Sequence, residues 1–257
     1  MKFLNKIIIS GCAAILFIIS LFVLFGCATQ NSKENDKLAN LHLNLAAEYI
    51  KAENYPLALK ELLIAEELNP NDPFVNANLG LVYFMRERYE LAEKYYRKAI
   101  LIKPDFTDAK NNLGRAYVEI GKYKQAEVLL NEVLQDLTYT GFTKAYANYG
   151  ILEFKQKKYT NAITNLKKSL ERDRENCYTQ VFLGRCYLEL NDKAFAITQL
   201  DKAIPLCLAI DSDEAHFYSA IALYRNNEKD KSKLRFEELL SRFPSGNSAE
   251  KAQKMLE

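Results

Sequence analysis

Histidine and cysteine are scarce in this chain, which limits the chemistry that its side chains can do. The 257 residues include two histidines, His42 and His216, and five cysteines. Metal sites and acid–base sites that depend on histidine are therefore poorly supplied. The sequence carries no nucleophile elbow, phosphate-binding loop, zinc-protease motif or dinucleotide-binding motif. We therefore predict no catalytic residue, no metal site, no cofactor and no enzymatic activity.

The composition indicates a helical protein with no affinity for nucleic acid. Hydrophobic residues make up 49% of the chain and charged residues 26%, as in folded globular proteins. Nine glycines and six prolines are too few for an all-β chain, which needs frequent turns. The net charge is +2, and Lys2 and Lys6 account for it, so the rest of the chain is neutral. A neutral body lacks the basic surface that binds nucleic acid.

The first 27 residues have the layout of a secretory signal. An amino-terminal basic stretch precedes the apolar run Ile7–Phe25, and a polar stretch follows Cys27. The end of the run, Leu24–Cys27, resembles the lipobox of bacterial lipoproteins. This resemblance implies cleavage before Cys27, lipid attachment to Cys27 and, because Ala28 rather than aspartate follows, sorting to the outer membrane. The alternative is an uncleaved transmembrane anchor, because a run of about 19 apolar residues can span a bilayer.

The rest of the chain is built from a repeat of 34 residues. Leu45, Leu79 and Leu113 stand 34 residues apart, and a tyrosine follows each of them four residues later. Small residues that recur at fixed positions let two antiparallel helices approach closely, while large residues fill the space between successive pairs. The alanines of the second helix keep the same register: Ala58, Ala92, Ala126, Ala162 and Ala196.

This pattern resembles the tetratricopeptide repeat (TPR). The resemblance implies an all-α fold, a right-handed solenoid of six helix-turn-helix repeats over residues 39–246. A lipidated cysteine and flexible tether (27–38) would precede it, and a capping helix or tail (247–257) would follow. His42 and His216 both fall at the fourth position of a repeat, where we expect packing residues. The repeats start near Ala39, Pro73, Thr107, Thr143, Cys177 and Asp213, with two-residue insertions before the fourth and sixth.

Partner-facing residues of TPR proteins lie on the first helix of each repeat, at positions 2, 5, 9, 12 and 13. Eight of these ten residues are apolar in repeats one and two, against one of five in repeat three. Exposed apolar side chains mark partner sites, and this set suits an amphipathic helix or an extended apolar peptide. Alternatively, the tether or a terminal segment covers the groove, and the polar residues of repeat three are merely solvated. The predicted groove comprises Leu43, Ala47, Ile50, Phe74, Ala77, Leu81, Phe84 and Met85, with Asn111 and Arg115 of repeat three.

Three cysteines fall in repeat five. Cys177 opens its first helix and Cys207 closes its second, so an antiparallel pair would bring them side by side. In an oxidising compartment we predict a disulfide there, worth roughly 3–4 kcal/mol for a loop of about 30 residues. Cys186 lies in mid-helix and is expected to be a small buried apolar residue. Three free thiols are the alternative. A zinc site is disfavoured because no CxxC pair exists and His216 is the only histidine nearby.

The lipobox, short polar tether and six repeats together resemble the type IV pilus pilotins of the PilF/PilW/Tgl family. Asn111-Asn112, Gln135-Asp136, Tyr139 and Arg242–Gly246 add to this likeness. The resemblance implies a non-enzymatic lipoprotein on the periplasmic face of the outer membrane. Such a protein binds a secretin subunit through its groove and promotes secretin assembly for pilus biogenesis. The alternative is a TPR lipoprotein scaffold for β-barrel insertion or murein-hydrolase docking. Neither role involves nucleic acid or a small-molecule substrate.

Overall fold

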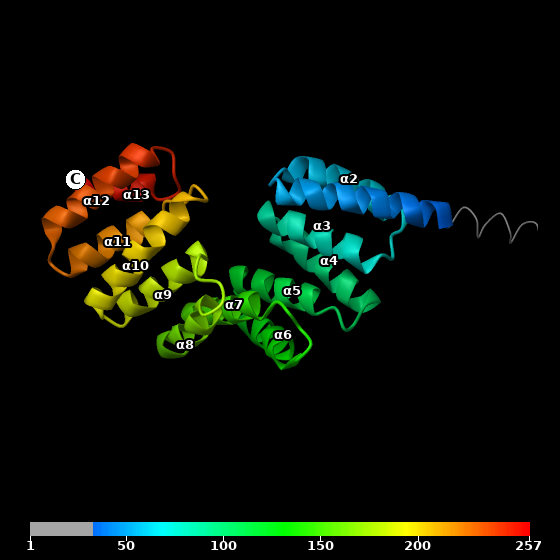
Figure 1. Cartoon of the computed structure of the whole chain (residues 1–257), viewed down its shortest axis with the longest axis horizontal. Coiled ribbons are helices and arrows are strands. Elements are labelled where there is room, and N and C mark those ends of the chain that lie inside the picture. The colour runs from blue at the N-terminus through cyan, green and yellow to red at the C-terminus, as the bar shows by residue number, and fades with distance from the viewer. Residues whose placement is uncertain (1–32) are drawn as a thin grey trace, which may run out of the picture. The chain divides into compact units, whose positions relative to one another are not determined.

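A computed structural model describes residues 33–257, and every regular element in that range is a helix. The helices follow one another as antiparallel pairs (Figure 1). The predicted signal segment and the predicted lipidation site Cys27 lie outside the described residues. Contacts divide the chain into two compact bodies, and the boundary in the sequence falls between Pro104 and Asp105. We call residues 33–104 the N-terminal body and residues 105–257 the C-terminal body, and each is described by itself.

The N-terminal body contains the first two helix pairs. Its first helix covers residues 33–51, and its core is a cluster of fully buried apolar side chains that includes Leu62 and Leu79. Asp72 caps the third helix, because its carboxylate accepts hydrogen bonds from the backbone N–H groups of Phe74 (2.7 Å) and Val75 (3.0 Å). The remaining helices are α2 (Tyr55–Leu68), α3 (Pro73–Met85) and α4 (Tyr89–Ile102).

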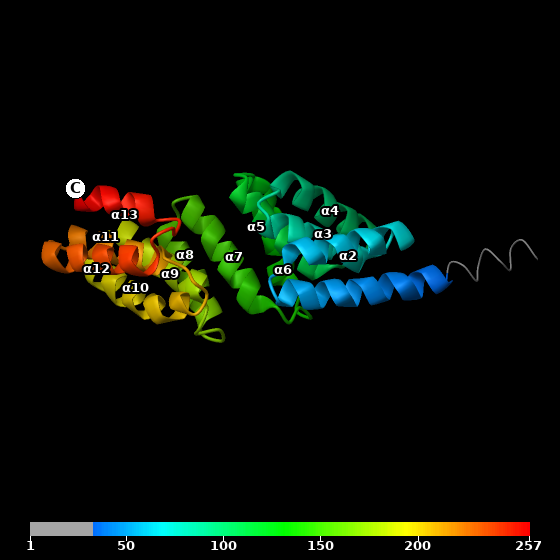
Figure 2. The same ribbon diagram turned by 90° about the horizontal axis from the view of Figure 1, so that it is seen from above.

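The C-terminal body contains four helix pairs and a last short helix. Successive helices pack against each other, and the first helices α5, α7, α9 and α11 also contact one another in sequence. Both views show α13 beside α12 (Figures 1 and 2). The helices are α5 (Thr107–Glu119), α6 (Tyr123–Gln135), α7 (Phe142–Lys155), α8 (Tyr159–Leu170), α9 (Cys177–Glu189), α10 (Lys193–Leu208), α11 (Glu214–Arg225), α12 (Lys229–Arg242) and α13 (Ala249–Leu256).

The helix boundaries confirm the all-α fold of helix-pair repeats predicted from the 34-residue period. Repeats two to six were predicted to start near residues 73, 107, 143, 177 and 213, and the corresponding helices begin within one residue of these positions. The five alanines that mark the second helices, from Ala58 to Ala196, are all fully buried. Small side chains at these positions let the paired helices pack closely, as the sequence pattern required.

The last six residues of the predicted tether are helical, and the rest of the tether lies outside the described residues. Residues 33–38 are helical and continue without a break into the first helix of repeat one. No glycine or proline occurs in residues 33–51, so no helix-breaking residue separates residues 33–38 from the rest of this helix. The Asp36 carboxylate also accepts a 2.9 Å hydrogen bond from the Asn69 side chain, which ties this extension to the loop after α2.

Each repeat turns between its two helices through a residue with positive φ. These residues recur at the repeat spacing, and their φ angles are 56° to 75°. The turn in repeat two is typical, because the N–H of Arg88 donates a 2.8 Å hydrogen bond to the carbonyl of Tyr83 and closes the helix end. Glycine occupies this position only once among Glu53, Glu87, Gly121, Lys157, Asn191 and Asn227.

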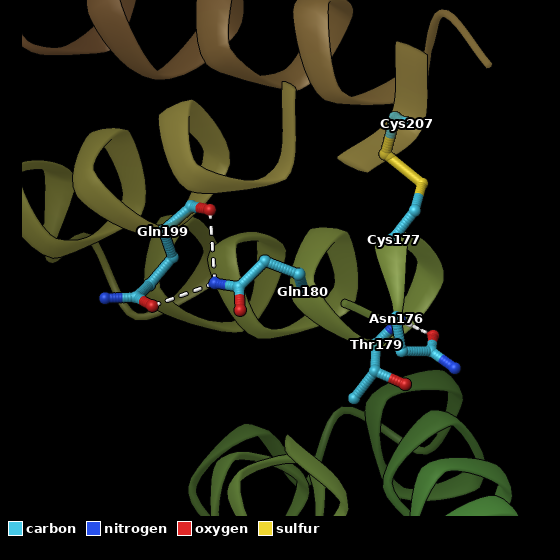
Figure 3. The surroundings of a disulfide bond; sticks show 6 residues. All are labelled: Asn176, Cys177, Thr179, Gln180, Gln199 and Cys207. Carbon is cyan, nitrogen blue, oxygen red and sulfur yellow. Dashed lines mark hydrogen bonds between the residues drawn. A yellow bond between two sulfur atoms is a disulfide. The ribbon is translucent and has the colours of Figure 1, made fainter. Parts of the chain in front are cut away.

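Repeat five is cross-linked at two places between α9 and α10 (Figure 3). The Sγ atoms of Cys177 and Cys207 are 2.00 Å apart, so the structure contains the disulfide that the helix arrangement predicted. Further along the same pair, the Gln180 side-chain amide donates to the backbone carbonyl of Gln199 (3.2 Å) and to its side-chain oxygen (2.9 Å). These contacts join the two helices at one end and near the middle.

Candidate partner-binding surface

The apolar residues predicted for the groove lie in the N-terminal body, and none of the eight is buried. Phe74 and Met85 are 47% and 45% exposed, although water disfavours large apolar side chains. Five of the eight follow one side of α3 at helical spacing. We call them the α3 strip: Phe74, Ala77, Leu81, Phe84 and Met85.

The members of the α3 strip differ in burial and in their contacts with neighbouring side chains. Leu81 and Phe84 are half-buried, and the Phe84 ring packs edge-on against Tyr89 with centroids 5.6 Å apart. The ammonium of Lys103 lies 5.1 Å from the centre of the Phe74 ring, a cation–π contact. The strip therefore consists of an anchored centre with more exposed ends at Phe74 and Met85.

Leu43 and Ile50 serve the core as well as the surface. Both are half-buried side chains of the first helix and pack against the core of the N-terminal body. Ala47, on the same helix, is exposed. The first helix therefore contributes only half-buried large apolar side chains to the predicted surface. The exposed large apolar side chains of that surface, Phe74 and Met85, belong to α3.

The structure does not support a partner-binding role for Asn111. This residue of α5 is 1% exposed, and its side-chain oxygen accepts a 3.0 Å hydrogen bond from Asn148 of α7. Arg115 is half-buried, and its guanidinium contacts Glu119 (3.2 Å) and Asn148 (3.5 Å). A buried amide must satisfy its hydrogen bonds inside the protein, so these residues join α5 to α7.

The loop between α6 and α7 is tied back to the start of α5. The Tyr139 hydroxyl donates a 3.0 Å hydrogen bond to Asp108, and burial, followed by the Asp108 charge, raises the pKa of Tyr139. The hydroxyls of Thr107 and Thr138 both donate to Asp136 and lower the pKa of its carboxyl. Asp136 and Tyr139 therefore hold the loop that contains the two-residue insertion in place.

Both histidines are packed within helix pairs. The Nδ1 atom of His42 lies 2.6 Å from the Glu61 carboxylate, and His216 is fully buried with its ring 5.7 Å from that of Phe243. Within residues 33–257, no group of three or more His, Cys, Asp and Glu side chains is placed to hold a metal ion. Cys186 is completely buried, and burial raises the pKa of its thiol to about 12.

One cluster of side chains around Arg185 was not predicted from the sequence. The guanidinium of Arg185 on α9 lies among three aromatic rings, those of Phe154 on α7, Phe182 on α9 and Tyr218 on α11. Arg185 occupies position 9 of repeat five and Phe154 position 12 of repeat four. Both are therefore partner-facing positions by the scheme applied to repeats one to three. Extending that scheme to the later repeats would have found them.

No helix in the part of the chain that the structure describes is long and apolar enough to cross a membrane. The apolar run Ile7–Phe25 lies outside that part. Its role as a cleaved signal or as an anchor thus stays a prediction.

Four family models, all of the tetratricopeptide repeat, match the chain. They cover residues 43–105, 83–137, 143–176 and 214–246, which together exceed half of the sequence. These ranges do not include residues 177–213, yet that segment folds as the helix pair α9 and α10. A search of curated proteins by sequence finds no match.

Solved structures share the fold over most of the chain. PilW, described as a widely conserved type IV pilus biogenesis factor, has a TM-score of 0.74 at 20% identity and covers 86% of this chain and 100% of its own. PilF of Pseudomonas aeruginosa has a TM-score of 0.66 at 20% identity, with 86% and 99% covered. The Cut9–Hcn1 structure of the APC/C reaches 0.74 at 14% identity, but only 46% of that chain is covered. The chain therefore belongs to the tetratricopeptide-repeat proteins and has the fold of PilW and PilF.

Proposed function

We propose that this protein is an outer-membrane lipoprotein that binds a secretin subunit and promotes secretin assembly in type IV pilus biogenesis. The observation that carries the proposal is the match to PilW, a type IV pilus biogenesis factor, over 100% of the PilW chain. The Cut9–Hcn1 match covers less than half of the other chain, so this protein agrees with PilW in extent as well as fold. The lipobox-like Leu24–Cys27 supports the membrane attachment.

The α3 strip is the proposed contact for the partner. Its ends, Phe74 and Met85, expose apolar surface to water, which is unfavourable. Burial of this surface against apolar side chains of a partner would be favourable and would stabilise the complex. Methionine and phenylalanine adapt to an apolar helix or an extended segment, which suits recognition of one element of a secretin subunit. The mechanism is non-enzymatic, and partner capture at the membrane raises the local concentration of subunits that must assemble.

Lipid on Cys27 is the proposed membrane anchor. Each buried CH₂ group contributes roughly 0.8 kcal/mol, and more than one acyl chain is needed for stable attachment. We expect Cys27→Ser to remove the protein from the outer-membrane fraction without changing its helical content. If the variant still partitions with the outer membrane, lipid on Cys27 is not the anchor.

The partner assignment is tested with Phe74→Glu combined with Met85→Glu. Both side chains are exposed, so the charges fall on the proposed contact rather than in the core, unlike charges at the half-buried Leu81 or Phe84. We expect the double variant to keep its circular dichroism spectrum and to lose secretin from pull-downs of envelope extracts. Cells carrying it should also lose heat-stable secretin multimers.

The matched control is Leu101→Glu, which places a charge on α4 of the same body, at a side chain that is 82% exposed and outside the α3 strip. Secretin capture and multimers should survive this change. Normal multimers in the double variant would refute the α3 strip as the contact. Capture of a β-barrel assembly component or a murein hydrolase instead of secretin would refute the pilus role.

A further inference from the structure

Arg185 lies in a box of aromatic rings that three successive repeats build together. Its guanidinium carbon is 4.7 Å from the ring centres of Phe154 and Phe182 and 4.2 Å from that of Tyr218. The rings come from α7, α9 and α11, the first helices of repeats four, five and six, and α9 contacts both other helices. Figure 1 shows these three helices in the C-terminal body.

The guanidinium of Arg185 makes no hydrogen bond or ion pair with any residue in the range 33–257. Its side chain is nevertheless half-buried. Arginine carries five N–H donors in a planar fork, and a contact between its guanidinium and an aromatic ring uses none of them as a hydrogen bond. No carboxylate oxygen in the described range lies within 4.0 Å of its nitrogens. The rings therefore hold the guanidinium, and its N–H donors have no hydrogen-bond acceptor within the described chain.

The charges around the box restrict what it can bind. The carboxyl of Glu214, at the start of α11, interacts electrostatically with Arg185, Lys155 and Glu119 but forms no hydrogen bond or ion pair in the described chain. Its negative charge disfavours a second, doubly charged anion such as phosphate near the guanidinium. A single carboxylate matches the fork bidentately and adds the least negative charge. The aromatic faces provide apolar contact for the rest of a peptide.

We infer that the Arg185 box binds a carboxylate group of a partner polypeptide, either an acidic side chain or a C-terminal carboxylate. The box adds a second, polar contact to the partner binding proposed above. It does not rest on the partner being a secretin, because only the carboxylate is specified. A guanidinium already held by three rings loses little side-chain entropy on binding, which favours recognition even of a short peptide.

The test uses the purified full-length protein in detergent and three fluorescent hexapeptides. The first has one central glutamate and an amidated end, the second has glutamine there and a free C-terminal carboxylate, and the third has glutamine and an amidated end. We expect one of the first two to bind about tenfold more tightly than the third in fluorescence anisotropy, since a hydrogen-bonded charge pair is stronger than a neutral hydrogen bond. Whichever binds identifies the source of the carboxylate.

Substitutions at Arg185 separate binding from packing. Arg185→Met keeps the apolar stem among the rings and should abolish the preference for the carboxylate, while Arg185→Lys keeps the charge but loses the fork and should weaken it. The control Arg174→Ala removes an exposed arginine between α8 and α9 and should have no effect. Equal binding of all three peptides, an unchanged preference in Arg185→Met, or stronger competition by inorganic phosphate than by acetate would overturn the inference.

Discussion

Gly184 on α9 packs directly against Leu200 on α10, so close that a Cβ atom at residue 184 would lie 2.5 Å from Cγ of Leu200. Real Cβ atoms essentially never approach another carbon so closely. Leu200 is fully buried and cannot move aside without disturbing the core of repeat five. The small residue in the first helix thus sets the separation of the pair.

Gly184→Ala should therefore destabilise the protein even though alanine favours helices. Overpacking costs about 1–3 kcal/mol. The higher helix propensity of alanine relative to glycine offsets at most about 1 kcal/mol of this cost. We expect a net fall in the free energy of unfolding of about 1–2 kcal/mol in urea titrations. The same substitution in a Leu200→Ala background should cost less. An equal cost in both backgrounds would show that contact with Leu200 is not the cause.

Glu87→Gly should stabilise the protein. Glu87 has a φ of 58° at the turn of repeat two, and such a left-handed conformation costs a residue with a Cβ atom roughly 1–2 kcal/mol. Part of this gain is lost to the greater freedom of glycine in the unfolded chain. We expect an increase of up to about 1 kcal/mol in the free energy of unfolding.

The matched reverse change is Gly121→Ala at the equivalent turn of repeat three. Gly121 has a φ of 75°, and an added Cβ would meet no atom within 4 Å, so only backbone strain changes. This variant should lose about 1 kcal/mol or somewhat more in the same denaturation assay. Opposite signs for the two variants are required, and equal signs would contradict the left-handed turn.

Removal of the Cys177–Cys207 bond should lower stability by about 3–4 kcal/mol, because it closes a loop of 30 residues. The test is the double variant Cys177→Ala with Cys207→Ala, measured by urea denaturation under oxidising conditions. The control Cys186→Ala alters only a buried thiol and should cost much less.

The thiol of Cys186 should also resist iodoacetamide in the native protein. Burial raises its pKa to about 12, so the reactive thiolate is scarce at neutral pH. Mass spectrometry should therefore find native Cys186 unmodified and label it only after unfolding. Free Cys177 or Cys207 in the protein purified under oxidising conditions would contradict the disulfide.

His216 should make the protein sensitive to mild acid. The ring is fully buried, its Nε2 atom lies 3.5 Å from the Glu238 carboxylate, and burial outweighs that nearby charge and lowers the pKa of His216 below its usual 6.5. As the pH falls through about 6.5, the unfolded chain binds a proton that the folded chain resists, so the free energy of unfolding falls. The effect is absent well above that pH.

The measurement is urea denaturation at pH 7.5 and pH 5.5 for the native chain and for His216→Leu. The drop in stability between the two values should be smaller in the variant. Burial raises the pKa of Glu153 and Glu214, which contributes in the opposite direction as the pH falls, so only the difference between the two proteins isolates His216. An identical drop in both would exclude His216 as the acid-sensitive group.

The sequence alone determined the repeat and its register. Residues that recur with the repeat, such as Ala58 and Pro73, predict a helix pair every 34 residues. The helices begin where that period places them. The Cys177–Cys207 pairing also followed from the period, because antiparallel helices bring those ends together. The start of the first helix did not, since residues 33–38 lack apolar periodicity and are held through the Asn69–Asp36 contact.

Only the tertiary structure decided which side chains are available to a partner. Asn111 stands at a position that the repeat pattern assigns to the surface, yet Asn148 from the next first helix buries it. Arg185 is one charged residue among many in the sequence, and the rings of α7 and α11 are what hold its guanidinium in a box. Exposure and orientation depend on contacts between residues about 30 positions apart, and a periodic pattern specifies the helices but not which neighbouring side chains cover one another.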